Sequence, residues 1–265
     1  MRPQFIRAGL AGVLLLFAGW VGATETCPIE RQDRRAAVAH VYDADTLTLA
    51  DRTRVRLIGI DAPELGREGA PHEPYALEGR DYLRRLIADA GHQVLLHYGE
   101  ERYDRHGRLL AYVFLPDGRN VNRLLLEQGY VMQIFIAPNT HYAECLKPFE
   151  TQARRQAKGI WSQSEYQPGL ASTRIPASTQ GAAIVQGQVV RIGSSRDNFW
   201  INLEGGVALQ VPKRALNGFD LSEAQVRALQ GKRVRARGWL VRDHNSRHHD
   251  WRMRINTSLA LEVLD

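Results

Sequence analysis

Three aspartates stand where predicted strands of the N-terminal half end. Asp43 and Asp45 lie in a turn between two short strands and Asp61 follows a third, so we expect their carboxylates to converge. Asp45 and Asp61 supply hard oxygen ligands of the kind that Ca²⁺ and Mg²⁺ take, and two carboxylates leave positions for water and a phosphate oxygen. An open metal site of this kind suits hydrolysis of a phosphodiester.

Charged residues close by in the sequence could complete that chemistry. Arg56 presents a planar fork of donors that fits a phosphate. Glu64 follows Pro63 at the start of a loop, where its carboxylate is free to orient or deprotonate a water. Arg108, at the end of the basic segment 104–108, offers a second guanidinium for the charge that builds on phosphorus.

Each signal alone has a simpler explanation. An Asp-x-Asp pair is most often a turn former, and a single arginine on a strand is commonly a surface or ion-paired residue. Glu64 alone is typical of a solvated helix start, and Gly107 with Arg108 of a hairpin corner. The prediction therefore depends on the combination of these residues in one order.

The elements that must position them follow the order of a small Greek-key barrel. Alternating patterns predict strands at 38–41, 46–49, 54–57, 93–98 and 109–115, and helices over about 74–90, 120–129 and 141–158. Three strands, a helix, two strands and then helices is the order of an OB fold with appended helices.

Six strings over residues 35–163 together resemble the thermonuclease family, the staphylococcal-nuclease-like enzymes. They are VYDADTLTL, VRLIGIDAPE, DRHGRLLAYVFLPDGRNVN, EQGY, PNTHY and KGIW. The resemblance implies a five-stranded OB barrel with three helices. It also implies a Ca²⁺-dependent nuclease, an endonuclease, that cuts DNA and/or RNA with little base preference and leaves 3′-phosphate ends.

The resemblance also implies the ligands of the metal. Asp45 and Asp61 match the calcium carboxylates of the family, and the backbone carbonyl of Ala62 matches a third ligand. Asp43 matches an outer acidic residue close to the metal. Ala44 replaces a glycine and Ala62 replaces a threonine of the family pattern, and neither change threatens a site made of carboxylates and a carbonyl.

Catalytic roles carry over in the same way. Arg56 and Arg108 match the two arginines that hold the scissile phosphate, and Glu64 matches the glutamate that orients or activates water. We expect Glu64→Gln or Arg56→Ala to lower turnover by orders of magnitude while leaving the fold intact. His106 and Phe135 stand about where tyrosines of the family contact phosphate, so substrate preference does not carry over.

The length of the chain and a local change in its composition predict two domains joined by a linker. Its 265 residues, 44% hydrophobic and 24% charged, match two ordinary globular domains and exclude a disordered, collagen-like or disulfide-dense protein. The stretch 164–181 is rich in Pro, Ser, Thr and Gly and is predicted as a linker between a nuclease domain (24–163) and a second domain (182–265).

The second domain repeats the plan in smaller form. Strands are predicted at 184–192, 199–203, 207–211, 233–241 and 251–255, with a helix at 221–229 that begins in a capping box of Asp220 and Glu223. This order predicts a second, smaller OB-like barrel. The fold class is therefore mainly β with helices (α+β).

Basic residues alternate along two strands of this second domain, which carries 13 Lys and Arg against 8 Asp and Glu. The predicted stripe consists of Arg233, Arg235, Arg237, Trp239, Arg252 and Arg254. Such a surface can follow a phosphate backbone while the ring stacks on a base. A solvated sheet face on a basic protein is an equally good interpretation, and OB barrels also bind oligosaccharides and proteins.

Four residues of a predicted hairpin loop could hold a transition metal, because imidazoles suit such ions. They are His244, His248, His249 and Asp250. We favour the alternative of an exposed loop that is rich in histidine, because no strand register fixes these ligands.

The first 23 residues have the pattern of a secretory signal. Arg2 and Arg7 precede an apolar run over 8–21, and cleavage is predicted after Ala23. An uncleaved anchor is the alternative, but the run is shorter than the roughly 20 residues of a spanning helix. We expect a secreted or periplasmic monomer without stable membrane association.

The cysteine count and the net charge bear on the redox state of the protein and on its partners. Cys27 and Cys145 form a disulfide in an oxidising compartment, or remain two buried thiols. The formal net charge of +6 favours polyanions, either nucleic acid or anionic lipid. A non-catalytic module that binds nucleic acid or an envelope partner is the competing class, although it would have no need of the site described above.

Overall fold

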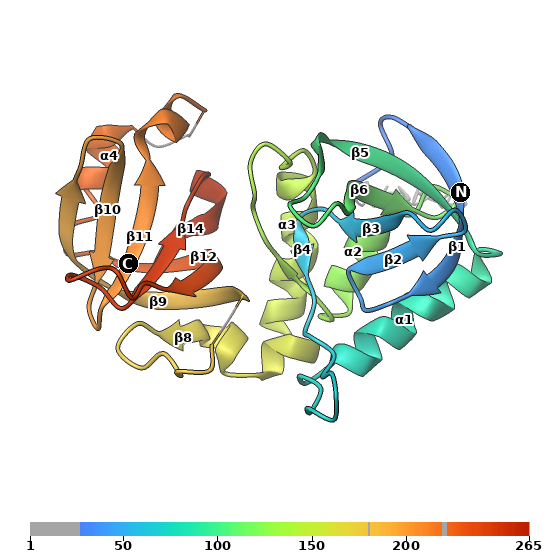
Figure 1. The fold of residues 1–265 in the computed structure, drawn as a ribbon, viewed down its shortest axis with the longest axis horizontal. Coiled ribbons are helices and arrows are strands. Elements are labelled where there is room, and N and C mark those ends of the chain that lie inside the picture. The colour runs from blue at the N-terminus through green and yellow to red at the C-terminus, as the bar shows by residue number, and fades with distance from the viewer. Residues whose placement is uncertain (1–26, 180, 219–221, 265) are drawn as a thin grey trace, which may run out of the picture.

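The structure is a computed structural model that describes residues 27–179, 181–218 and 222–264. The predicted signal peptide, residues 1–23, lies outside the described residues. Two β-barrels lie side by side, the first carrying most of the helices (Figure 1). None of the helices in the described ranges combines the length and apolar character needed to cross a membrane.

The first barrel is closed and has the strand order β1-β2-β3-β6-β5. Its strands are β1 (Arg34–Val41), β2 (Thr46–Leu49), β3 (Arg54–Leu57), β5 (Gln93–Tyr103) and β6 (Leu109–Phe114). β1 pairs antiparallel with β5, and β3 pairs parallel with β6. This is the predicted OB order, and it is confirmed together with the mainly β class.

Helices cover this barrel where the sequence predicts them. They are α1 (Ala76–Asp89), α2 (Val121–Glu127) and α3 (Ala143–Arg155), followed by a 3₁₀ turn at Gly159–Ser162. The side chain of Asn120 accepts the N–H of Arg123 and so caps α2. Two short strands, β4 (Ile60–Asp61) and β7 (Met132–Gln133), form an antiparallel pair that leads from the barrel to the helices.

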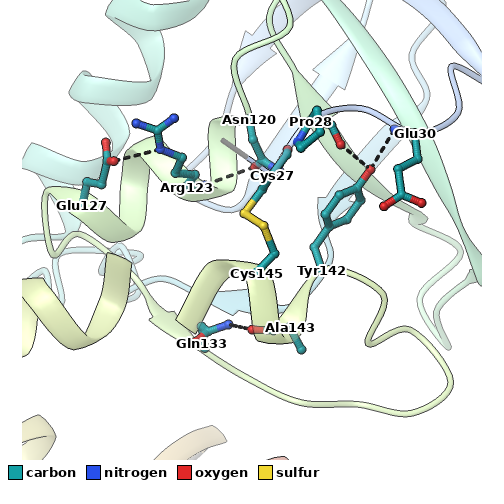
Figure 2. The surroundings of a disulfide bond; sticks show 10 residues. All are labelled: Cys27, Pro28, Glu30, Asn120, Arg123, Glu127, Gln133, Tyr142, Ala143 and Cys145. Atoms are coloured by element: carbon teal, nitrogen blue, oxygen red, sulfur yellow. Dashed lines mark hydrogen bonds and ion pairs between the residues drawn. A yellow bond between two sulfur atoms is a disulfide. The ribbon is translucent and has the colours of Figure 1, made fainter. Parts of the chain in front are cut away.

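A disulfide joins Cys27 to Cys145, so the structure contains the bonded alternative of the two that the sequence leaves open. It ties the segment before β1 to α3 (Figure 2). The hydroxyl of Tyr142 in the same region donates to the carbonyl of Pro28 and accepts the N–H of Glu30. The N-terminal segment is thus held by covalent and polar contacts.

The disulfide should contribute measurably to stability. We expect the double variant Cys27→Ser, Cys145→Ser to lower the free energy of unfolding by about 2–4 kcal/mol, because a bond across 118 residues strongly restricts the unfolded chain. Urea unfolding of the oxidised protein and the variant measures the difference. Identical midpoints for the two would contradict the expectation.

The second barrel follows the same order, and β12 pairs with β9 to close it. Its strands are β9 (Gly181–Ser194), β10 (Asn198–Leu203), β11 (Val207–Pro212), β12 (Arg233–Arg242) and β13 (Trp251–Arg254). Two short strands extend it, with β14 (Leu261–Val263) beside β12 and β8 (Leu170–Ala171) beside β9. Because β8 lies inside the predicted linker, that segment is partly built into the second barrel.

Helix α4 (Glu223–Arg227) lies between β11 and β12, as predicted, but it begins differently. Its capping box consists of Ser222 and Gln225. The capping box predicted from Asp220 and Glu223 is therefore wrong, since Glu223 is already the first residue of the helix and Asp220 lies outside the described residues. The observed capping box has the same three-residue spacing as the predicted one, but it begins two residues later in the chain.

The outer face of β12 packs against the first barrel. Arg237 forms an ion pair with Glu150 of α3, with Nη1 at 2.8 Å from Oε2, and both side chains are buried. The same nitrogen donates to the carbonyl of Gln133. Phe135 packs against the core of the second barrel, and the Arg237 guanidinium lies 5.7 Å from its ring centre.

The predicted basic stripe is therefore wrong for Arg237, which is neither a phosphate contact nor a solvated residue. Arg235 is also engaged, through Glu262 at 3.1 Å and the carbonyl of Pro168. The alternation along β12 places these side chains on the outer face of the second barrel, as expected. The first barrel, however, covers the outer face of β12 at Arg237. Arg233, Trp239 and Arg254 are exposed, and Arg252 pairs with Asp243.

The buried pair should make the two barrels depend on each other. We expect Arg237→Ala to lower the free energy of unfolding by about 3–5 kcal/mol, because it leaves the Glu150 carboxylate buried without its cation. Arg254→Ala removes an exposed arginine from the same barrel and should change the value by no more than about 0.5 kcal/mol. Urea unfolding measures both, and equal effects would contradict this role of the pair.

Candidate active site

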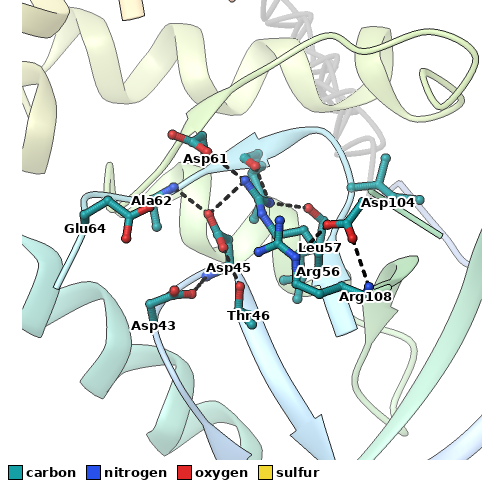
Figure 3. A network of polar contacts seen from close by, with 12 residues as sticks. Asp43, Asp45, Thr46, Arg56, Leu57, Asp61, Ala62, Glu64, Asp104 and Arg108 are labelled. Carbon is teal, nitrogen blue, oxygen red and sulfur yellow. Dashed lines mark hydrogen bonds and ion pairs between the residues drawn. The ribbon is translucent and has the colours of Figure 1, made fainter. Parts of the chain in front are cut away.

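The residues predicted to do chemistry gather at one end of the first barrel (Figure 3). The loop between β1 and β2 carries Asp43 and Asp45, the end of β3 carries Arg56, and β4 ends at Asp61. The strand register pairs Thr46 with Arg56, which brings the first loop against the third strand. The convergence expected from the sequence is therefore present in the structure.

The loop between β1 and β2 is held by its own polar groups. Asp43 Oδ1 accepts the N–H of Asp45 at 2.9 Å. Asp45 Oδ1 accepts the hydroxyl of Thr46 at 2.9 Å, and its Oδ2 accepts the N–H of Ala62 at 2.8 Å. Both aspartates are buried. The Asp-x-Asp pair therefore does form the turn. The contacts with Thr46 and Ala62 also hold the Asp45 carboxylate in one orientation.

Arg56 is the centre of the cluster. Its Nη1 donates to the carbonyls of Leu57 and Ile60, each at 2.7 Å. Its Nη2 lies 2.7 Å from Asp61 Oδ1 and 3.0 Å from Asp45 Oδ2. One buried guanidinium therefore joins the end of β3, the short strand β4 and the first loop.

Burial and mutual repulsion set the protonation of the acids. Burial, and then the charge of Asp45, raises the pKa of Asp43 to about 7. Burial also raises the pKa of Asp61 to about 8, against the opposing charge of Arg56. Burial disfavours the charge of Arg56 itself, but the carboxylates of Asp45 and Asp61 outweigh it and raise the pKa of the guanidinium. The cluster therefore contains more acidic groups, Asp43, Asp45 and Asp61, than cationic groups, Arg56 alone.

The donors of this site fit a hard divalent cation. Asp45 and Asp61 each contact the same Arg56 nitrogen, at 3.0 Å and 2.7 Å, and Asp45 also accepts the N–H of Ala62, so the three candidate ligand residues are neighbours. Within the described ranges, no three His, Cys, Asp or Glu side chains form a group able to hold a metal by themselves. Water would therefore fill the remaining positions, as Ca²⁺ and Mg²⁺ allow.

Glu64 opens the loop that leads from β4 to α1. Its N–H donates to Glu73 Oε2 at 2.8 Å, and its carbonyl accepts the N–H of Glu73, so the two ends of the loop are joined. The side chain of Glu64 is exposed and lies beside Ala62 (Figure 3). Loss of hydration, and then the charges of Asp45 and Glu73, raises its pKa. A carboxyl in this setting is suited to accept a proton from water.

Arg108 enters from the loop between β5 and β6, and Asp104 positions it. Asp104 Oδ2 accepts Nε of Arg108 at 2.6 Å, and its Oδ1 accepts the N–H groups of His106 and Arg108. We did not assign a role to Asp104 from the sequence, although its place at the start of a tight turn is the signal. The His106 side chain is exposed, and its Nε2 accepts a hydrogen bond from Nε of Arg105.

The contacts of Arg56 change the expectation that its loss leaves the fold intact. Arg56→Ala would leave Asp45 and Asp61 without their cation, so we expect the free energy of unfolding to fall by about 3–5 kcal/mol. Arg108→Ala breaks a more exposed pair with Asp104 and should cost about 1 kcal/mol or less. Urea unfolding in chelator measures both variants. A fully stable Arg56→Ala protein would contradict this view of the cluster.

A closed OB barrel with a carboxylate and arginine cluster between its strand ends defines the class of staphylococcal-nuclease-like barrels. The family model described as staphylococcal nuclease homologue matches residues 54–163. A thermonuclease of Staphylococcus hyicus is 34% identical over 129 residues, which cover 47% of this chain and 74% of that protein. An uncharacterized endonuclease of Escherichia coli O157:H7 is 32% identical over 144 residues, 53% of this chain and 86% of that protein.

The chain belongs to the staphylococcal-nuclease-like family and is a nuclease by that membership. A thermonuclease of Staphylococcus intermedius, 32% identical over 127 residues, is a further relative. The family match ends at residue 163, before the second barrel begins.

Proposed function

We propose that the first barrel is a Ca²⁺-dependent endonuclease that hydrolyses DNA and/or RNA with little base preference and leaves 3′-phosphate ends. The observation that carries the proposal is the bridge from Arg56 to both Asp45 and Asp61, with Glu64 beside it and Arg108 on the adjoining loop. Names of relatives, thermonuclease and endonuclease, support the same class.

Each side chain has one task in this reaction. Asp45, Asp61 and the carbonyl of Ala62 would hold the calcium ion, which when bound supplies positive charge to a phosphate oxygen. Asp43 fixes Asp45 through its backbone N–H. These ligands sit on a turn and a strand end, which keep them in place without substrate.

The remaining residues act on the phosphate and the water. Arg108 would bind the scissile phosphate with its Nη groups, since Asp104 engages only its Nε. Both Nη groups of Arg56 already donate within the cluster, so Arg56 would contact the phosphate through its Nε–H and stabilise the developing charge from beside it. Glu64 orients the water and takes its proton as the oxygen attacks phosphorus. The P–O5′ bond breaks, the 5′ oxygen leaves and takes a proton from solvent water, and the phosphate stays on the 3′ carbon.

The rest of the chain has a proposed place in this function. Residues 1–23 direct export and are removed after Ala23, so that the enzyme works as a monomer in the periplasm or the medium. Residues 24–163 form the nuclease domain, 164–181 connect it, and 182–265 form a domain that helps hold nucleic acid. The disulfide is consistent with an oxidising compartment.

A non-catalytic module that binds nucleic acid or an envelope partner is the second candidate. It would need only a basic surface, whereas this chain keeps an exposed carboxylate at Glu64 next to the buried cluster. An exposed acid beside a phosphate site weakens simple binding of a polyanion and has a purpose only if it handles a proton.

Cleavage assays on the full mature chain test the proposal. With labelled DNA and RNA we expect cleavage in Ca²⁺ and none in chelator. Glu64→Gln should lower turnover by about 10²–10⁴-fold, because it removes the group that activates water. The matched control is Glu68→Gln, an exposed glutamate of the same loop, which should retain wild-type turnover.

Calcium binding separates loss of chemistry from loss of metal. Ca²⁺ should raise the melting temperature of the wild type and of Glu64→Gln, and should not raise that of Asp45→Asn. Binding of nucleic acid without cleavage in every metal would instead place the chain in the non-catalytic class.

A further inference from the structure

A groove of about 590 Å³ lies on the second barrel, away from the residues that contact the first barrel. Its lining comes from the end of β9, from β10, and from the loop 243–250 between β12 and β13. Trp200 and Asn202 of β10 line it, together with Arg191 of β9 and His248 of the loop. This surface is separate from the basic stripe predicted from the sequence.

The groove occupies the same topological place as the active site. In the first barrel, the loop between strands one and two carries Asp43 and Asp45, and the loop between strands four and five carries Asp104 and Arg108. In the second barrel, the corresponding loops are 195–197 and 243–250, and both contribute to the groove. OB folds bind oligonucleotides and oligosaccharides on the face between these two loops.

The Trp200 side chain of the groove is held in place. The indole of Trp200 lies 5.5 Å from the His249 ring at 31° and donates to Ser195 Oγ at 3.3 Å. His249 is itself fixed on both ring nitrogens, by Ser246 Oγ at 3.0 Å and by Asp243 Oδ2 at 3.2 Å. His249 therefore positions Trp200 and is not free to bind a metal. A half-buried, fixed indole is a platform for stacking of a base.

The charge around the platform is positive. Asp243 is the one acid that lines the groove, and Arg252 and His249 pair with it. Two exposed acids, Asp197 and Asp250, stand on the same two loops, so the arginines named next outnumber the unpaired acids by one. Arg191 lines the groove, and Arg196 and Arg247 stand next to lining residues on the two loops. All three arginines are exposed, and no salt bridge within the described ranges engages them. Exposed cations beside an aromatic ring favour a polyanion over a neutral sugar chain.

We propose that this groove is a second nucleic-acid site, which binds single-stranded DNA or RNA by stacking a base on Trp200 and holding phosphates with Arg191, Arg196 and Arg247. The proposal deepens the proposed function, on which it rests: the second barrel retains the substrate that the first barrel cleaves.

Binding of a fluorescent 20-nucleotide oligo(dT) to the full mature chain in chelator tests the groove without cleavage. Trp200→Leu should weaken binding at least about fivefold, because one stacking contact is lost. Arg191→Ala should weaken it and reduce the dependence of log affinity on log salt by about one. Since Arg191 is exposed, this variant reports on binding even if Trp200→Leu folds poorly.

Two matched controls lie outside the groove. Lys232→Ala removes an exposed cation at the opposite end of β12 from the loop 243–250, and Trp239→Leu removes the exposed aromatic of the predicted stripe. Both should bind as the wild type does. Wild-type affinity for Trp200→Leu and Arg191→Ala overturns the proposal, and so does a loss confined to Trp239→Leu. Failure of the proposed function would appear separately, as absence of cleavage by the wild type in Ca²⁺.

Discussion

The Arg56 guanidinium is buried among two backbone carbonyls and two carboxylates, and the geometry of the nuclease end of the molecule depends on it. A buried cation is tolerated only when its charge and its donors are satisfied. The same holds for the acids, because Asp45 and Asp61 repel each other in a poorly hydrated site. Each group therefore requires the others, and the backbone segments that carry them are fixed as a consequence.

A second buried arginine, Arg237, neutralises a buried carboxylate at the contact between the two barrels. Arg237 of the second barrel supplies the cation that Glu150 of the first barrel lacks. Glu150 also accepts the N–H of Gln133, which belongs to β7, and β7 pairs with the strand β4 that ends at Asp61. The contact with the second barrel is thus one strand away from Asp61.

Both barrels use the same two loops for their polar groups. In the first barrel these loops hold acids and one arginine at the candidate active site, and in the second they flank Trp200, with Arg196 and Arg247 on them. An aspartate follows the fourth strand in each barrel and pairs with an arginine, Asp104 with Arg108 and Asp243 with Arg252. The shared strand order makes one end of the barrel the place where loops from distant parts of the chain meet.

The sequence by itself predicted both barrels and the order of their main strands and helices, though not the short strands β4, β7, β8 and β14, and it indicated Asp45, Arg56, Asp61, Glu64 and Arg108 as candidate site residues. These follow from short-range alternation and from motifs whose residues lie within a few positions of one another. Tertiary structure alone decided that β12 turns Arg235 and Arg237 toward the first barrel, and that Asp104 positions Arg108. It also joined Cys27 to Cys145 and set His249 against Trp200. The alternation of polar and apolar residues indicates which side of a strand faces away from its own barrel. What packs against that side depends on contacts between residues far apart in the chain.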